Sequence, residues 1–249
     1  MENKSLFPTE EVTLPSKGLV YPPENPLSKG VLEMKYMTAK EEDILTNETY
    51  IKKGNVIDKL LQSLIITPIN YNDLIIGDKN AIMIAARVLG YGKDYSFKID
   101  DEEHTVDLTE IKDKELKEEC LLEKGKNEFE FILPTLKKSV TFKILTHGDE
   151  KKVQTELEGI KKIQKEKPEL TTRLKHMILS IDGDYERKTI REFVDTNLLA
   201  RDARALRAYV KEIQPDVNLV FDLETEAGDV RGGVSIPIGV SFFWPDTEL

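Results

Sequence analysis

The sequence predicts an α+β fold, in which helical and strand-forming segments follow one another in blocks. Apolar residues recur at helical spacing in residues 36–92, alternate at every second position within residues 94–146, and return to helical spacing beyond. We therefore divide the chain into five parts: an extended proline-rich arm (1–30), a strand with a three-helix module (31–93), a small antiparallel β region (94–147), a helical segment (148–216) and a C-terminal β-hairpin with an aromatic tail (217–249).

The first 30 residues are predicted to be extended because they are rich in proline, which disfavours helix. Val12 and Leu14 offer apolar anchors near the middle of this arm, and Leu6 and Phe7 offer them near its start. Docking over its own domain is the commoner outcome for such an arm, and docking over a partner is the alternative. Residues 31–37 alternate between apolar and charged side chains, which predicts a half-buried strand.

Residues 36–92 contain three helix signals. Thr38 and Glu41 form a capping-box pattern for the first helix. After a stop at Gly54, Asn55 is expected to cap the second helix. Asp78 is expected to cap the third, which ends in the glycine-rich stop at residues 90–92.

The following region is predicted to form one small antiparallel sheet across residues 94–146. A hairpin is expected at residues 95–108, and two further strands at residues 129–133 and 140–144. A short charged helix is predicted between them, at residues 110–122.

Four helices are predicted next, followed by strand-like segments at residues 219–223 and 234–238 around a glycine-rich turn. The helices are expected at residues 150–167, 170–181, 189–199 and 202–213.

Composition favours a soluble protein of the cytoplasm. The net charge of −10 disfavours nucleic-acid binding, and no apolar run approaches the roughly 18 residues of a membrane span. The single cysteine, Cys120, excludes an internal disulfide and fits a reducing compartment.

No residue pattern points to an enzyme, a metal site or a cofactor. The three histidines have no second ligand at metal-binding spacing, and the glycine–lysine pairs at residues 77–80 and 90–93 lack the phosphate-loop pattern. Cys120 lies among carboxylates that discourage a thiolate. We therefore expect no catalytic, cofactor-binding or metal-binding residues.

Two groups of residues are candidates for binding a partner protein. Phe242, Phe243 and Trp244 are a cluster of the kind that carries binding energy at interfaces, although packing in the protein's own core is the commoner role. Arg201, Arg204 and Arg207 lie along one helix edge and would suit an acidic partner. A solvated face compensated by nearby Asp202 and Glu212 is the alternative for these arginines.

Six collinear segments resemble the baseplate hub assembly proteins of T-even-like contractile-tailed phages. They are LPSKGLVYP (14–22), MTAKEEDIL (37–45), IKKGNVIDKLL (51–61), IGDKNAIMIAARVLGYG (76–92), LLARDARALRAYVKEIQPDV (198–217) and FFWPD (242–246).

The resemblance implies a non-enzymatic assembly factor, or chaperone, that binds hub or tape-measure proteins in the host cell cytoplasm while the central hub of the baseplate forms. The alternative is a stoichiometric structural component of the virion baseplate hub. Short cysteine pairs are expected in the β regions of relatives, one of them just before the terminal aromatic segment. Residues 221–228 contain no cysteine, so we expect no zinc ribbon here. Which hub protein is bound, and the oligomeric state, stay open at this point.

Overall fold

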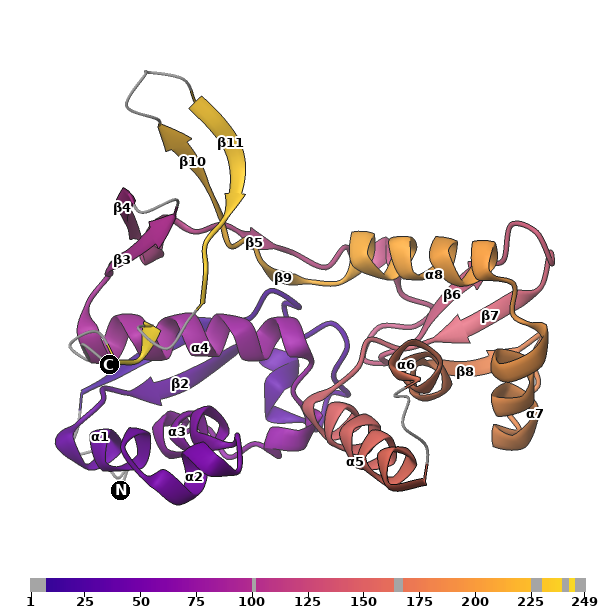
Figure 1. Cartoon of the computed structure of the whole chain (residues 1–249), viewed down its shortest axis with the longest axis horizontal. Helices are drawn as coiled ribbons and strands as arrows, with labels where there is room; N and C mark the ends of the chain where they lie inside the picture. Colours follow the sequence, from indigo (N-terminus) through magenta and orange to yellow (C-terminus); the bar gives the residue numbers. More distant parts are fainter. Residues whose placement is uncertain (1–7, 100–101, 164–167, 225–229, 239–241, 245–249) are drawn as a thin grey trace.

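The structure, a computed structural model, describes residues 8–99, 102–163, 168–224, 230–238 and 242–244. It has the predicted α+β fold, with helices and small antiparallel sheets. Figure 1 shows an elongated molecule with the N-terminal helices at one end and a three-stranded sheet with its helices at the other. Helix α4 (Ile76–Tyr91) runs along the middle of the N-terminal half.

The proline-rich arm lies on its own domain. It forms strand β1 (Thr9–Thr13), a loop and a 3-10 turn (Pro26–Lys29), and then leads into the predicted strand β2 (Val31–Lys35). β1 and β2 pair antiparallel, with Val12 opposite Leu32. Leu14, Tyr21 and Leu27 of the arm are buried in the core. The expected anchors Leu6 and Phe7 lie outside the described residues.

The helical module has four helices where three were predicted. The capping box at Thr38 and Glu41 begins α1 (Ala39–Leu45), but Asn47 starts a separate helix, α2 (Glu48–Lys52). Asn47 breaks the first segment because its side chain accepts hydrogen bonds from the amides of Thr49 and Tyr50.

Two residues that were predicted to cap helices make no capping hydrogen bond with their side chains. Asn55 precedes α3 (Val56–Leu64), but its side chain makes no capping hydrogen bond. α4 begins earlier than predicted, after Ile75, so Asp78 lies within its first turn. The Asp78 carboxylate instead binds distant residues of the arm, which outcompete the local cap. The predicted stop is confirmed, since α4 ends at Gly92 with a positive φ of 84°.

The β region consists of separate small sheets rather than one. The predicted hairpin is present as β3 (Asp94–Ile99) and β4 (Glu102–Asp107). The helix predicted at residues 110–122 is wrong: the segment contains two 3-10 turns (Leu108–Glu110 and Glu118–Cys120) and strand β5 (Asp113–Lys114), which pairs with β9 (Asp216–Val217). Buried Leu116 and half-buried Ile111 are five residues apart, which would place them about 140° apart on a helix. One face of a helix could therefore not bury both side chains.

A three-stranded sheet forms the core of the other end of the molecule. β6 (Phe129–Ile132) pairs with β7 (Ser139–Phe142), and β7 pairs with β8 (Ile178–Ile181). Residues 178–181 were predicted to be helical, but α6 (Glu169–Met177) ends before them. They form a strand because the second edge of buried β7 needs a backbone partner.

Helices α6, α7 and α8 lie around this sheet, and α5 lies beside α6 (Figure 1). Their bounds are α5 (His147–Ile163), α7 (Arg187–Glu192), which continues as a π-helical turn (Phe193–Asn197), and α8 (Ala200–Ile213). The predicted C-terminal hairpin is present as β10 (Val220–Glu224) and β11 (Val230–Ser235). It stands beside the β3–β4 hairpin and packs on it through Phe221 and Phe97, whose rings are 5.2 Å apart. Among the described residues, no helix is both long and apolar enough to span a membrane.

Candidate partner-binding site

A groove of about 530 Å³ lies between strand β1 and helix α4. Strand β1 lines the groove, and so do four of the residues between 108 and 113. The floor consists of apolar side chains of α4, of which several stay half-exposed. These half-exposed floor residues are Ala85, Val88 and Leu89.

Among the residues that the structure describes, the charged side chains lining this groove are all acidic. Glu10, Glu11 and Asp113 line it, and no described lysine or arginine does. Burial raises the pKa of the Asp113 carboxyl, and the neighbouring carboxylates of Glu115 and Asp216 raise it further. An apolar floor with uncompensated acidic walls suits an apolar segment that carries positive charge.

The arm that carries β1 is anchored to α4 through Asp78. Its carboxylate is fully buried and accepts hydrogen bonds from the Ser16 amide (2.9 Å), the Ser16 hydroxyl (2.6 Å) and the Tyr21 hydroxyl (2.6 Å). The Tyr21 oxygen in turn accepts a hydrogen bond from the Ile75 amide. The Leu116 amide also donates to the Pro15 carbonyl, which ties the arm to the segment after β5. Asp78 therefore fixes the position of β1 relative to the groove floor.

This anchor is expected to make stability depend on pH. Burial raises the pKa of Asp78 to about 6, although the hydrogen bonds from Ser16 and Tyr21 favour the carboxylate. A carboxyl whose folded pKa is raised adds stability below its unfolded pKa, near 4, and loses it as pH rises through about 6. The free energy of unfolding of the wild type relative to Asp78→Asn should therefore fall by about 2 kcal/mol between pH 4 and pH 7. Urea unfolding at both pH values measures this difference, and an unchanged difference would contradict it.

The three predicted arginines lie on the exposed edge of α8. Arg201, Arg204 and Arg207 are exposed, and none forms an ion pair within the part of the chain that the structure describes. Asp202 is buried and accepts hydrogen bonds from the amides of Thr135 and Leu136, and the charge of Arg201 also stabilises its carboxylate. Their role in binding an acidic partner stays a prediction.

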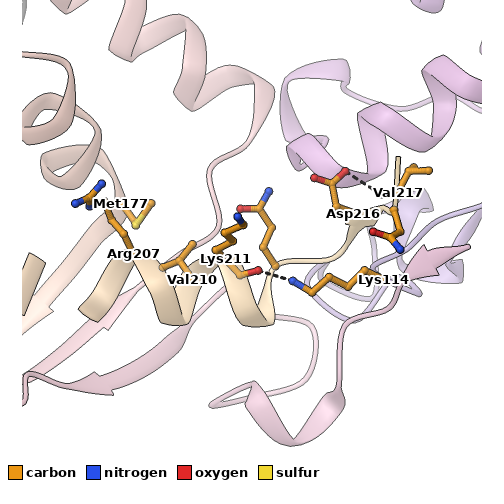
Figure 2. A pocket seen from close by; sticks show the side chains of 9 residues that line it. Lys114, Met177, Arg207, Val210, Lys211, Asp216 and Val217 are labelled. Atoms are coloured by element: carbon orange, nitrogen blue, oxygen red, sulfur yellow. Dashed lines mark hydrogen bonds between the residues drawn. The ribbon is translucent and has the colours of Figure 1, made fainter. Parts of the chain in front are cut away.

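A second hollow, of about 380 Å³, lies where α8 meets the β5–β9 pair. Figure 2 shows Lys114 of β5 donating to the backbone carbonyl of Lys211, while Arg207 lies further along the helix. Asp216 on the other side accepts a hydrogen bond from the Asn80 side chain (2.8 Å). This hollow mixes both signs of charge, so its chemistry selects a ligand less clearly than the groove does.

The aromatic tail packs inside the protein. Phe242 and Phe243 are 0% and 2% exposed, and the Phe242 ring is 5.0 Å from that of Tyr95. Trp244 is half-buried against the same core. The alternative of core packing therefore holds for Phe242 and Phe243, which offer no surface to a partner in this conformation.

A buried polar cluster joins helices α3, α4 and α5. Asp58 pairs with Lys79 (2.6 Å) and accepts from the Tyr71 hydroxyl (3.1 Å), and His147 lies 3.6 Å from the same carboxylate. Burial lowers the pKa of His147, although nearby Asp58 opposes this. Lys79 and Tyr71 both bind Asp58, and Lys79 also lies 3.4 Å from the His147 Nδ1, so the cluster cross-links the helices, although the buried His147 Nε2 has no hydrogen-bond partner among the described residues. In the described part of the chain, no three side chains of the metal-ligating types gather in a way that could hold an ion.

The groove was not predicted from the sequence, although its floor lies on the predicted third helix. Ile84, Ala85, Val88 and Leu89 belong to the helix expected to end at residues 90–92, and a stripe of apolar residues on such a helix is normally buried. The width of this apolar stripe is the sequence feature that indicates an open groove, because apolar residues occupy more of the helix surface than a single neighbouring element can cover.

The fold and the groove define a class: an α+β protein with an apolar groove open to solvent and acidic walls. Comparison with known proteins adds no closer identity, since no protein-family model, curated sequence or solved structure matches the chain.

Proposed function

We propose that this protein is a non-enzymatic assembly factor that covers an apolar segment of another protein in the groove between β1 and α4. The observation that carries the proposal is the combination of half-exposed Ala85, Val88 and Leu89 with walls whose charged side chains, as far as the structure describes them, are all acidic. An apolar surface left open in this way is typical of a site where a partner binds.

The partner class is supported by the sequence. The six segments similar to phage baseplate hub assembly proteins favour a hub or tape-measure protein as the partner, bound in the host cell cytoplasm. The net charge of −10 keeps such a factor away from nucleic acid while it handles apolar chains.

Substituting Ala85 by arginine tests this function. Ala85 is half-exposed on the groove floor, so a long side chain can reach solvent without unfolding α4. The added charge should repel a basic, apolar segment and fill the groove. Recovery of hub or tape-measure proteins with the tagged protein from infected cells should fall by about tenfold or more. A tenfold fall corresponds to a loss of about 1.4 kcal/mol of binding free energy.

Gln154→Arg is the matched control, because Gln154 is exposed on α5 and does not line the groove. Circular dichroism should give the same helix content for both variants and the wild type. Equal recovery of tail proteins with Ala85→Arg and with Gln154→Arg would contradict binding in the groove. Recovery of no tail protein with any of the three would contradict the proposed partner class.

A further inference from the structure

Strand β1 has an open edge that faces no other strand. It belongs to a two-stranded sheet whose only other member, within the described residues, is β2.

The hydrogen bonds at the two ends of the β1–β2 pair show which backbone groups of β1 point away from β2. The Leu14 amide donates to the Gly30 carbonyl (2.8 Å), and the Tyr36 amide donates to the Pro8 carbonyl (3.3 Å). Both continue the β1–β2 register. Hydrogen-bonded pairs alternate along an antiparallel ladder, so Glu10 and Val12 are the bonded positions within β1.

The backbone groups of Thr9, Glu11 and Thr13 therefore point outward. None of their amides or carbonyls takes part in a backbone hydrogen bond outside the β1–β2 pair in the described part of the chain. Glu11 and Thr13 are exposed, and Thr9 is half-exposed. These residues offer three donors and three acceptors at the spacing that an added strand requires.

The open edge borders the groove, since Glu10, Glu11, Val12 and Thr13 all line it. A strand added to β1 would lie about 4.8 Å from it, over the groove. Every second side chain of that strand would face the apolar floor of α4. The remaining side chains would point to the opposite face, on the side of Glu11, so basic residues there would meet a carboxylate that no lysine or arginine among the described lining residues neutralises.

We propose that the occupant of the groove is an extended segment of the partner protein, with alternating apolar and basic residues, which adds to the outer edge of β1 as a third strand. This rests on the proposed function and names the form in which the partner binds. The acidic edge of β1 selects basic segments and repels a second copy of the same strand.

A labelled heptapeptide of alternating lysine and valine is the probe, and a heptapeptide of alternating glutamate and valine is its matched control. Fluorescence anisotropy should show binding of the lysine peptide only. Amide hydrogen exchange should then slow at Thr9, Glu11 and Thr13 when the lysine peptide binds. Binding of the lysine peptide without protection of these amides, equal binding of both peptides, or no binding of either would overturn the proposal.

Two variants separate the backbone contact from the charge. Glu11→Pro removes an outward amide that the β1–β2 ladder does not use, so β1 should stay paired and peptide affinity should fall by about tenfold or more. Glu11→Gln keeps the amide, and affinity should fall by about threefold or less. Equal affinities of the two variants would overturn strand addition, and the amide exchange of the wild type decides the matter if Glu11→Pro does not fold.

Two further outcomes have separate meanings. Protection of the three amides that depends on protein concentration, without peptide, would show that a second copy occupies the edge and would overturn the proposal. Capture of tail proteins from infected cells with the three amides left unprotected would keep the proposed function and overturn strand addition. Protection of the three amides by the peptide, with no tail proteins in the capture, would keep strand addition and overturn the proposed function.

Discussion

Replacing Gly77 by alanine is expected to lower the free energy of unfolding by about 3 kcal/mol or more. A Cβ atom at this position would lie 1.8 Å from the backbone carbonyl oxygen of Pro215. Since the obstacle is backbone, no side-chain rotation can relieve the clash. The first turn of α4 would have to separate from the chain around β9, whose Val217 also lines the groove.

Gly159→Ala is the matched control for this substitution. Gly159 is exposed in α5, and a Cβ atom there would meet nothing within 4 Å. Helix propensity alone predicts that alanine stabilises each helix, by about 1 kcal/mol at most. Urea unfolding should therefore give opposite signs for the two variants. A stabilising effect at Gly77 would show that α4 and residues 215–216 do not pack as closely as described.

Phe242→Ala is expected to destabilise the protein by about 3–5 kcal/mol, because it removes a fully buried ring. The ring packs edge-on against both Tyr95 and Phe243, each at 5.0 Å between centroids. The cavity left behind would loosen the β3–β4 hairpin, where the Tyr95 hydroxyl donates to the Pro237 carbonyl (2.8 Å).

Ile163→Ala serves as the control, because Ile163 is 86% exposed at the end of α5 and its truncation should change stability by about 0.5 kcal/mol at most. Thermal and urea unfolding of both variants measure the difference. A Phe242→Ala protein with wild-type stability and impaired partner capture would instead place the aromatic tail at an interface.

The features that the sequence predicted correctly are local. The capping box of Thr38 and Glu41, the stop at Gly92 and the β3–β4 hairpin each depend on residues a few positions apart. Such signals survive folding because their partners are already adjacent in the unfolded chain.

The features that failed depend on residues far apart in the sequence. Asp78 has the composition of a helix cap, but its partner Ser16 lies 62 residues away. Residues 178–181 fit a helical stripe, but β7, almost 40 residues earlier, needs a partner for its edge. The groove could not be predicted for the same reason: its floor and its walls come from parts of the chain that only tertiary packing brings together.

The candidate site residues show the same difference between local features, which the sequence predicts, and long-range features, which it does not. The exposure of the three α8 arginines followed from their spacing along one helix. The burial of Phe242 and Phe243 did not follow from sequence, because a terminal aromatic cluster looks alike whether it fills a core or binds a partner.

The most direct test of a factor that covers its partner only during assembly is its copy number in finished particles. Quantitative mass spectrometry of purified virions, and of baseplate assembly intermediates from the same infection, gives this number relative to the hub proteins. The protein should be present in the intermediates, and absent from virions or far below the hub copy number. A copy number in virions equal to that of a hub protein would contradict a transient role and favour a structural component of the baseplate hub.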